Sequence, residues 1–191
     1  LAEASPTDSV FVRVFADDRP YATKTAALDA DKKYSLSIPL KPGLVKYRCE
    51  FGRKSGDREE VLHTAHNLIC GDAFLIIGQS NAVATDFGKE NPLAASEWVR
   101  TFGATAGDPN GSRLKQWANA EARSPGGKSE IGYWGMELGR RLVATERVPV
   151  CILNGAVGGT RIDQHQRNED DPTDVRTIYG RLLWRVRQAK L

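Results

Sequence analysis

Residues 71–82 read Gly-Asp-Ala-Phe-Leu-Ile-Ile-Gly-Gln-Ser-Asn-Ala, an apolar run of strand length that leads through a glycine into a serine. The run 74–77 is too short for a helix and lacks polar alternation, which is typical of a fully buried strand in a parallel sheet. Gly78 permits a sharp turn out of this strand, and Ser80 falls where a helix begins. A hydroxyl there lies beside free backbone N–H groups, where acyl-transfer enzymes place a nucleophile. The alternative is that Ser80 only caps the following helix.

The chain before residue 69 has a different hydrophobic period. Apolar and polar residues alternate in three stretches, which is the pattern of an antiparallel sheet with one face in water. Turns are expected at 41–43 and 54–57 because both segments contain glycine. The sequence predicts an antiparallel, β-sandwich-like region with strands around Val10, Val12 and Val14, around Tyr34, Leu36, Ile38 and Leu40, and around Val45, Tyr47, Cys49 and Phe51.

After residue 70 the pattern changes to buried strands that alternate with amphipathic helices, which indicates a parallel sheet. We expect strands at 74–77 and 149–153, helices near 132–146 and 174–188, and a long insertion over about 82–130. The last helix has apolar residues at i, i+3, i+4, i+7, i+8 and i+11 from Val175, and Thr173 or Asp174 is expected to cap it. Its arginines are expected on the solvated side: Arg176, Arg181, Arg185 and Arg187.

The composition is that of an ordinary globular protein, since 40% of the 191 residues are hydrophobic and 27% are charged. The net charge is only +3 and the basic residues are dispersed, which argues against a nucleic-acid partner. No apolar stretch approaches the roughly 20 residues that cross a bilayer, so no membrane partner is expected. Cys49, Cys70 and Cys151 have no Cys-x-x-Cys spacing, so neither a metal site nor a disulfide framework is indicated, and no cofactor is expected.

A second glycine-rich segment follows the strand expected at 149–153. Acyl transfer builds negative charge on a carbonyl oxygen, and backbone N–H groups aimed at that oxygen lower the barrier. Gly158 and Gly159 lack a Cβ, so backbone and substrate can approach closely at the carboxyl end of the strand, where ligands bind in open α/β sheets. The alternative is a tight turn without a chemical role. The spacing differs from Gly-x-Gly-x-x-Gly, which argues against a dinucleotide site.

Two motifs carry a resemblance to a known family. The first is Gly-Asp-x-x-apolar-x-x-Gly-Gln-Ser-Asn at 71–81, and the second is Trp134 to Gly139 followed by 148–160, which ends in Gly-Gly-Thr. Together they resemble the SGNH hydrolases, and among these the carbohydrate esterases of the sialate O-acetylesterase type. The resemblance covers about residues 68–190.

This resemblance implies a fold and an activity. The fold is α/β: a three-layer, flavodoxin-like parallel sheet, incomplete in this chain. Residues 1–69 would form the antiparallel β region, and residues 70–191 the N-terminal half of the hydrolase domain. The implied activity is that of a serine esterase that removes O-acetyl groups from a carbohydrate, either sialic acid or an acetylated plant or bacterial glycan. The implied location is secreted or periplasmic, although the chain itself carries no signal-peptide pattern.

The resemblance also assigns roles to residues. Ser80 corresponds to the nucleophile and Gly158 to an oxyanion donor, with Gly159 as the neighbouring alternative. Gln79, Gly159 and Arg161 are the substrate-binding candidates, and the Arg161 guanidinium suits a substrate carboxylate. Three aromatic side chains either contact a sugar ring or pack in the core: Trp98, Trp117 and Trp134.

Two parts of the family's machinery are not found in the sequence. The family takes its base from an Asp-x-x-His near the end of the domain, and a third oxyanion donor from an Asn after the third strand. We therefore expect residues 1–191 alone to be inactive, and the remainder of the enzyme or another chain to complete the sheet. The alternative is a local triad of Ser80, His165 and Asp163. His63 and His66 are expected to be structural or surface residues.

Two other functions compete with the esterase. The β region and the missing base favour a non-catalytic carbohydrate-binding or adhesion protein. An α/β-hydrolase nucleophile elbow is disfavoured, because residues 78–82 lack the second glycine of Gly-x-Ser-x-Gly.

Overall fold

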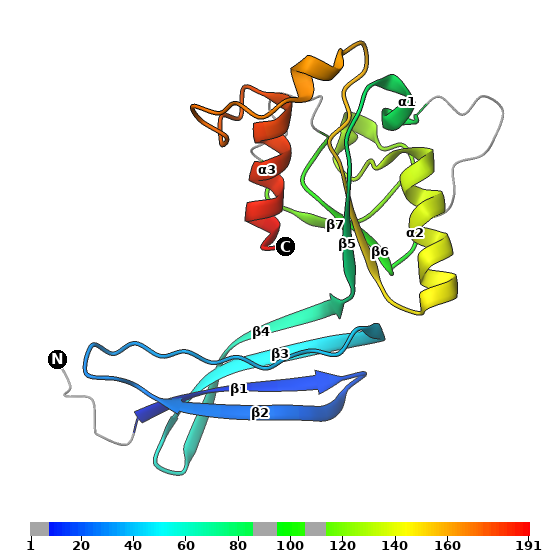
Figure 1. The fold of residues 1–191 in the computed structure, drawn as a ribbon. Helices are drawn as coiled ribbons and strands as arrows, with labels where there is room; N and C mark the ends of the chain where they lie inside the picture. The colour runs from blue at the N-terminus through cyan, green and yellow to red at the C-terminus, as the bar shows by residue number, and fades with distance from the viewer. Residues whose placement is uncertain (1–7, 86–94, 106–113) are drawn as a thin grey trace. The chain divides into compact units, whose positions relative to one another are not determined.

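The structure is a computed structural model that describes residues 8–85, 95–105 and 114–191. The chain divides into two compact units, Leu1–Cys70 and Gly71–Leu191. Each unit contains one four-stranded sheet (Figure 1).

The sheet of the first unit is antiparallel throughout. Its strands are β1 (Asp8–Ala16), β2 (Arg19–Ala27), β3 (Gly43–Ser55) and β4 (Arg58–Cys70), in the order β2-β1-β3-β4. The sequence predicted β1, β3 and the turn at 54–57 but named no strand at β2 or β4. Residues 34–40, predicted as a strand, belong to none of these strands, and the turn at 41–43 therefore joins no strand pair.

The segment 34–41 instead covers one face of this sheet. The Tyr34 ring stacks on the Phe51 ring with centroids 5.5 Å apart. The Tyr47 hydroxyl donates to the Lys41 carbonyl oxygen at 3.0 Å. Leu36, Ile38 and Leu40 are partly buried while their neighbours are exposed, so the two-residue period reflects one covered side and not strand pairing. In the described residues the first unit is therefore one sheet with the segment 34–41 over one face. Its described residues form no second sheet, so the sandwich-like prediction was wrong.

The sheet of the second unit is mixed. Its strands are β5 (Asp72–Ile76), β6 (Val99–Phe102), β7 (Trp117–Asn119) and β8 (Val150–Asn154), in the order β5-β8-β6-β7. β8 runs parallel to β5 and β6, as the strand-and-helix pattern predicted, whereas β7 runs antiparallel to β6. β6 and β7 lie inside the stretch predicted as an insertion. The sequence did not predict them, because runs of four and three residues are too short to show a hydrophobic period.

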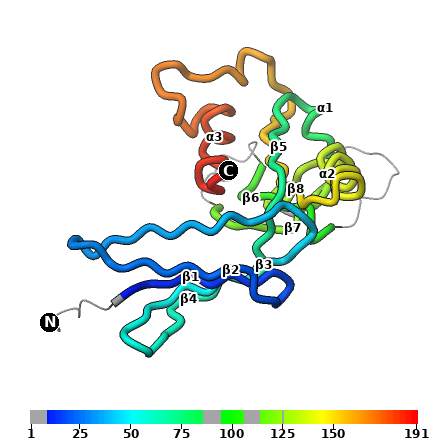
Figure 2. Tube along the Cα trace, turned by 60° about the horizontal axis from the view of Figure 1, so that its bottom comes forward, coloured from blue at the N-terminus to red at the C-terminus, as the bar shows by residue number. Residues whose placement is uncertain are grey.

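Helices cover both faces of this sheet. α2 (Gly132–Glu146) and α3 (Ile178–Ala189) lie on opposite sides, which is visible from two directions (Figures 1 and 2). The short α1 (Ser80–Val83) follows β5, and two 3-10 turns span Pro125–Gly127 and Ile162–His165. The α2-side core is Val99, Ala120, Ala122, Ile131, Met136, Val150 and Ile152, and the α3-side core is Phe102, Cys151, Leu153 and Leu182.

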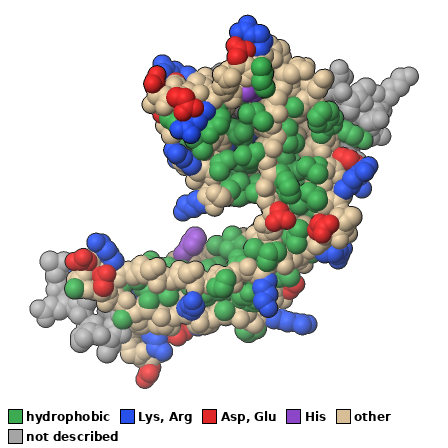
Figure 3. All heavy atoms as spheres, viewed as in Figure 1, with side chains coloured by type: hydrophobic (Ala, Val, Ile, Leu, Met, Phe, Trp, Pro, Cys, Tyr) green, Lys and Arg blue, Asp and Glu red, His purple; other side chains and the backbone are tan. Residues whose placement is uncertain are grey.

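The β5 strand is half exposed, which corrects the prediction of a fully buried strand. Leu75 pairs in register with Leu153 and therefore lies on the α3 face. α3 packs over β8 and β6, so Leu75 and Ile77 remain 52% and 47% exposed. Figure 3 shows hydrophobic side chains at the surface of this unit. Among the described strands β5 pairs only with β8, so its other edge is unpaired.

The last helix begins later than its apolar pattern suggested. Thr177, and not Thr173 or Asp174, is the N-cap, and its Oγ1 accepts a hydrogen bond from the Gly180 N–H at 2.9 Å. Val175 lies before the helix and is 38% exposed. Arg185 was predicted to be solvated but is only 1% exposed. Residue 185 is seven positions after Ile178, so it shares the buried face of α3.

Candidate active site

Ser80 stands at the start of α1, directly after the carboxyl end of β5. It is exposed, and its Oγ donates to the Gln79 Oε1 at 2.5 Å. Gln79 is the N-cap residue, and the same oxygen accepts from the Ser80 N–H at 2.8 Å. Ser80 is thus the first residue of the helix and not its cap, and Gln79 satisfies the free N–H beside it.

The loops that follow β5 and β8 are joined by backbone hydrogen bonds. The Gly155 N–H donates to the Ile76 carbonyl at 2.8 Å, and the Val157 N–H donates to the Gly78 carbonyl at 2.9 Å. A Cβ on Gly78 would lie 2.9 Å from the Cβ of Ala82, so the turn into α1 needs a glycine. These bonds extend the parallel pairing beyond the strands and hold the two loops side by side.

Gly158 faces Ser80 across these loops. An ideal Cβ on Gly158 would lie 3.9 Å from the Ser80 Cβ, and both residues are exposed. Gly159 has a φ of +72° and no atom within 4 Å of its ideal Cβ. The structure therefore brings Ser80 and Gly158 together at the carboxyl ends of adjacent parallel strands, where α/β proteins bind ligands.

Arg161, the candidate for a substrate carboxylate, forms an exposed ion pair with Asp163. The Arg161 Nη2 lies 2.8 Å from the Asp163 Oδ2, and the two side chains are 78% and 53% exposed. The hydrogen bonds from Arg161 hold the pKa of the Asp163 carboxyl below its usual value. A substrate carboxylate at Arg161 would compete with Asp163.

The local triad is not assembled in this structure. His165 is 8% exposed, and its Nε2 lies 2.8 Å from the Thr160 Oγ1. The Thr160 hydroxyl donates to the Val157 carbonyl at 2.5 Å, so the histidine Nε2–H is the donor in the Thr160 pair. The His165 Nδ1 is buried and has no hydrogen-bond partner in the described part of the chain. Ser80 bonds to Gln79 and Asp163 bonds to Arg161, so no hydrogen bond links the three.

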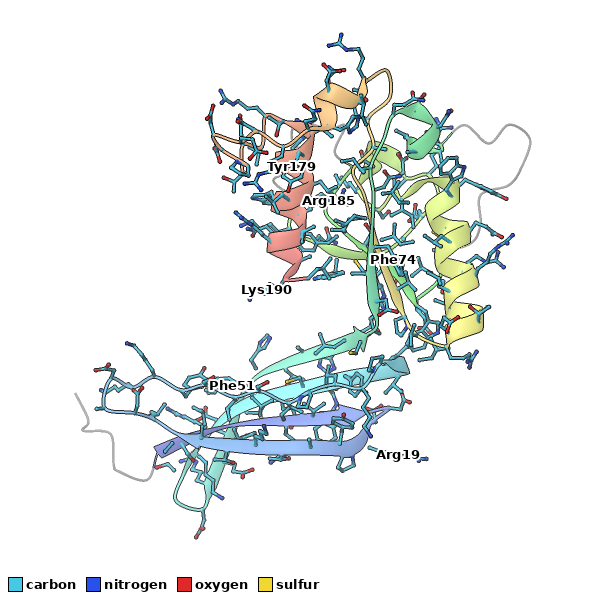
Figure 4. The ribbon with its side chains drawn as sticks, viewed as in Figure 1. Arg19, Phe51, Phe74, Tyr179, Arg185 and Lys190 are labelled. Carbon is cyan, nitrogen blue, oxygen red and sulfur yellow. The ribbon has the colours of Figure 1, made fainter. Side chains whose placement is uncertain are left out.

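Two residues at this site were missed by the sequence reasoning. Asn154 is buried at the end of β8, and its side chain bonds to three separate segments. Arg185 points from α3 toward the sheet (Figure 4) and donates to the Asn154 and Phe102 carbonyls at 2.6 and 2.9 Å. A polar residue that ends an entirely apolar strand was the available signal for Asn154, since buried amides are almost always hydrogen-bonded.

The remaining candidates are dispersed. Trp134 and Trp117 are 57% and 46% exposed, whereas Trp98 is partly buried.

The three cysteines form no disulfide bond. The described residues hold no group of three His, Cys, Asp or Glu side chains that could bind a metal ion. No helix in the described ranges is both long and apolar enough to cross a membrane.

Comparison with solved structures gives several likenesses, one of which is to a carbohydrate acetylesterase. No model of a protein family and no curated protein sequence matches this chain. The crystal structure of a carbohydrate acetylesterase from Xanthomonas citri is similar, with 19% sequence identity and a TM-score of 0.49. The match covers 96% of this chain and 42% of that protein, so the chain spans less than half of the neighbour's length.

Proposed function

We propose that this protein is a serine esterase that removes O-acetyl groups from a carbohydrate. The observation that carries the proposal is the approach of Gly158 to Ser80, with 3.9 Å between an ideal Gly158 Cβ and the Ser80 Cβ. The Gly158 N–H is the proposed donor to the carbonyl oxygen of an ester bound against the Ser80 hydroxyl. This pairing of a nucleophile with an oxyanion donor is what acyl transfer requires.

The reaction would proceed in two steps. The Ser80 Oγ attacks the acetyl carbonyl as a base takes its proton, and the sugar hydroxyl leaves with a proton to give an acetyl-serine. Water then attacks that ester and releases acetate and Ser80. Before the attack the Ser80 hydroxyl must leave Gln79, whose Oε1 accepts its hydrogen bond. Gln79, Gly159 and Arg161 are the proposed substrate contacts.

The substrate class rests on the sequence motifs. Gly-Gln-Ser-Asn at 78–81 and Gly-Gly-Thr at 158–160 resemble the sialate O-acetylesterase type. The same resemblance supports a secreted or periplasmic location.

We further propose that the general base comes from a polypeptide that pairs with the open edge of β5, either the remainder of the enzyme or another chain. Two observations support this. The described histidines form no hydrogen bond to Ser80, and β5 pairs only with β8 among the described strands. The exposed Leu75 and Ile77 supply an apolar surface for the added segment.

The test uses the intact protein, that is, residues 1–191 together with the polypeptide that completes the sheet. It combines covalent labelling by a fluorophosphonate ester with acetate release from an acetylated sugar. We expect labelling at Ser80, and loss of both labelling and acetate release in Ser80→Ala with folding intact. The matched control is Ser35→Ala, an exposed serine in the first unit. Near-normal turnover by Ser80→Ala would refute the proposal.

A second candidate, carbohydrate binding without catalysis, is favoured by a hollow in the first unit. Its volume is about 450 Å³. Its lining is mostly polar and can hydrogen-bond to sugar hydroxyls: Asp17, Asp18, Lys46, Tyr47, Arg48, His66 and Asn67. Oligosaccharide binding that is lost in Asp18→Ala, in a protein that fluorophosphonate never labels, would favour this function over the esterase.

A further inference from the structure

Asn154 occupies the point where the segments of the candidate site meet. It is the last residue of β8 and is 3% exposed. Its Nδ2 donates to the carbonyl oxygens of Ala82 and Ile131, at 3.0 and 2.9 Å. Its Oδ1 accepts from the Ala156 N–H at 2.9 Å. The partners fix which side-chain atom is nitrogen, because two acceptors and one donor surround the amide.

The first of these bonds restrains Ser80. Ala82 lies two residues after Ser80 in α1, a helix of four residues without a buried side chain. Such a helix has little apolar contact to hold it, and one turn is not stable by itself. The position of Ser80 therefore depends on polar tethers, which include the Asn154 bond to Ala82 and the Tyr133 N–H bond to the Ala84 carbonyl at 2.7 Å.

The Oδ1 bond restrains the opposite loop. Ala156 lies two residues before Gly158, and the next residue, Val157, bonds to Gly78. One side chain thus joins the segment that carries Ser80 to the segment that carries Gly158. Its own backbone carbonyl is held by the buried Arg185 guanidinium at 2.6 Å, which ties the junction to α3.

We propose that Asn154 is a positioning residue that fixes the separation between Ser80 and the Gly158 N–H. The proposal rests on the esterase function, because a fixed separation matters only if both groups act on one carbonyl. A buried amide with all three bonds made holds its partners in place, and each lost bond leaves a buried carbonyl or N–H unsatisfied.

The experiment compares Asn154→Asp and Asn154→Leu with wild type in the intact protein. Asp has the shape of Asn and can still accept from Ala156, but its carboxylate cannot donate to Ala82 and Ile131. Leu makes none of the three bonds. Asn119→Asp is the matched control, since Asn119 is exposed in β7. The first readout, amide hydrogen exchange, needs no catalysis.

We expect the protection factor of the Tyr133 amide to fall at least about tenfold in both variants, because each loses the hydrogen bond to Ala82 in α1 and the one to Ile131 before α2. The Ile152 and Leu153 amides within β8 should keep their protection. In Asn154→Asp, acidification should restore part of the Tyr133 protection, because a protonated carboxyl can donate one hydrogen bond. Asn154→Leu should show no such recovery, and Asn119→Asp should match wild type.

The second readout is kcat per site, that is, turnover divided by the number of Ser80 hydroxyls that a fluorophosphonate titrates. We expect kcat to fall at least about tenfold while KM changes little, because misplacement of the two groups affects the transition state more than substrate binding. A merely structural residue would lower the number of titratable sites and leave kcat per site unchanged.

The outcomes separate this proposal from the proposed function. Intact wild-type protein, with the polypeptide that completes the sheet present, that is neither labelled nor active refutes the esterase, and the exchange experiment still decides whether Asn154 holds α1. Unchanged Tyr133 protection overturns the proposal, and so does lost protection with unchanged kcat per site. If both variants fail to fold, scalar couplings across hydrogen bonds in wild type decide: couplings from the Asn154 Nδ2 to the Ala82 and Ile131 carbonyl carbons are expected, and their absence overturns the proposal.

Discussion

Gly158 and Gly159 are adjacent in sequence, but they differ in backbone conformation and in what a side chain at each position would contact. Gly159 has a positive φ, whereas Gly158 has a backbone conformation open to other residues. A methyl group on Gly158 would meet only the Ser80 Cβ, at an ordinary contact distance of 3.9 Å. Neither the backbone nor the described neighbours therefore require glycine at 158, whereas the backbone at 159 favours it, which makes the two positions separable by experiment.

We predict that Gly158→Ala keeps the free energy of unfolding within about 0.5 kcal/mol of wild type. Its kcat/KM for ester hydrolysis should fall at least about tenfold, because the methyl group displaces the substrate carbonyl. Gly159→Ala should instead lose about 1–2 kcal/mol of stability from its left-handed backbone. Urea denaturation and initial rates measure the two effects, and a reversed pattern would transfer the proposed oxyanion role to Gly159.

Cys151 permits a prediction about pH. Burial raises the pKa of its thiol from 9.0 to about 12. Between these values the unfolded chain has released the proton and the folded protein still holds it, so stability falls as pH rises. The thiol alone contributes a loss of about 1.4 kcal/mol per pH unit in this range. Wild type should therefore lose stability more steeply than Cys151→Ala between about pH 9.5 and 10.5, measured by urea denaturation with a reductant. Equal slopes would contradict the prediction.

At the scale of elements, the junction of α1 and α2 depends on Gly132. Its φ is +77°, and a Cβ there would lie 2.1 Å from the Val83 carbonyl oxygen. Gly126 has a similar φ of +70° but no atom within 4 Å of its ideal Cβ. Alanine substitutions at these two glycines therefore separate the cost of backbone strain from the cost of steric overlap.

We predict that Gly132→Ala destabilises the protein by about 1–3 kcal/mol more than Gly126→Ala, because α1 must move to admit the methyl group. Thermal unfolding measures the difference. The displacement should also lower the rate of fluorophosphonate labelling at Ser80. Equal losses of stability in the two variants would show that α1 does not obstruct a side chain at position 132.

The sequence predicted those elements whose own residues determine them. The helix predicted near 132–146 coincides with α2, and the strand predicted at 149–153 differs from β8 by one residue at each end. Elements that depend on distant partners were not predicted. Whether β5 is buried depends on which strands α3 covers, and whether 34–40 forms a strand depends on β2 occupying the place beside β1. Neither fact is local.

The candidate site shows the same difference between features that local residues predict and features that depend on distant residues. The position of Ser80 after a strand followed from its neighbours, and so did the glycine loop after β8. Apart from Ala156, the hydrogen-bond partners of the Asn154 and Arg185 side chains lie 23 to 84 residues away in the chain, which no pattern of spacing indicates. Arg185 was misjudged because arginine is usually exposed, whereas here carbonyls at the strand ends accept its hydrogen bonds. Burial lowers its pKa to about 10, so the guanidinium stays charged at neutral pH.

For the whole molecule, we predict that residues 1–191 alone release little acetate from 4-nitrophenyl acetate or an acetylated sugar. Serine needs a base near neutral pH, and the described histidines make no hydrogen bond to Ser80. Adding the polypeptide that completes the sheet should restore turnover. The measurement is acetate release with and without that polypeptide, with Ser80→Ala as the background.

One outcome would reverse this picture. Substantial turnover by residues 1–191 alone, abolished in His165→Ala, would mean that His165 leaves Thr160 and acts on Ser80. Asp163 would then have to exchange Arg161 for the histidine, and Arg161→Ala should raise the activity.

The uncovered edge of β5 also bears on the fate of newly made protein. An open strand edge offers unpaired N–H and carbonyl groups to any other extended chain, and natural proteins usually blunt such edges with charge. β5 carries a single charged residue, Asp72 at its start, while Leu75 is half exposed. We therefore expect molecules with this edge uncovered to aggregate through it as their concentration rises. A cell that makes the protein must then cover the strand quickly or hold the chain on a chaperone.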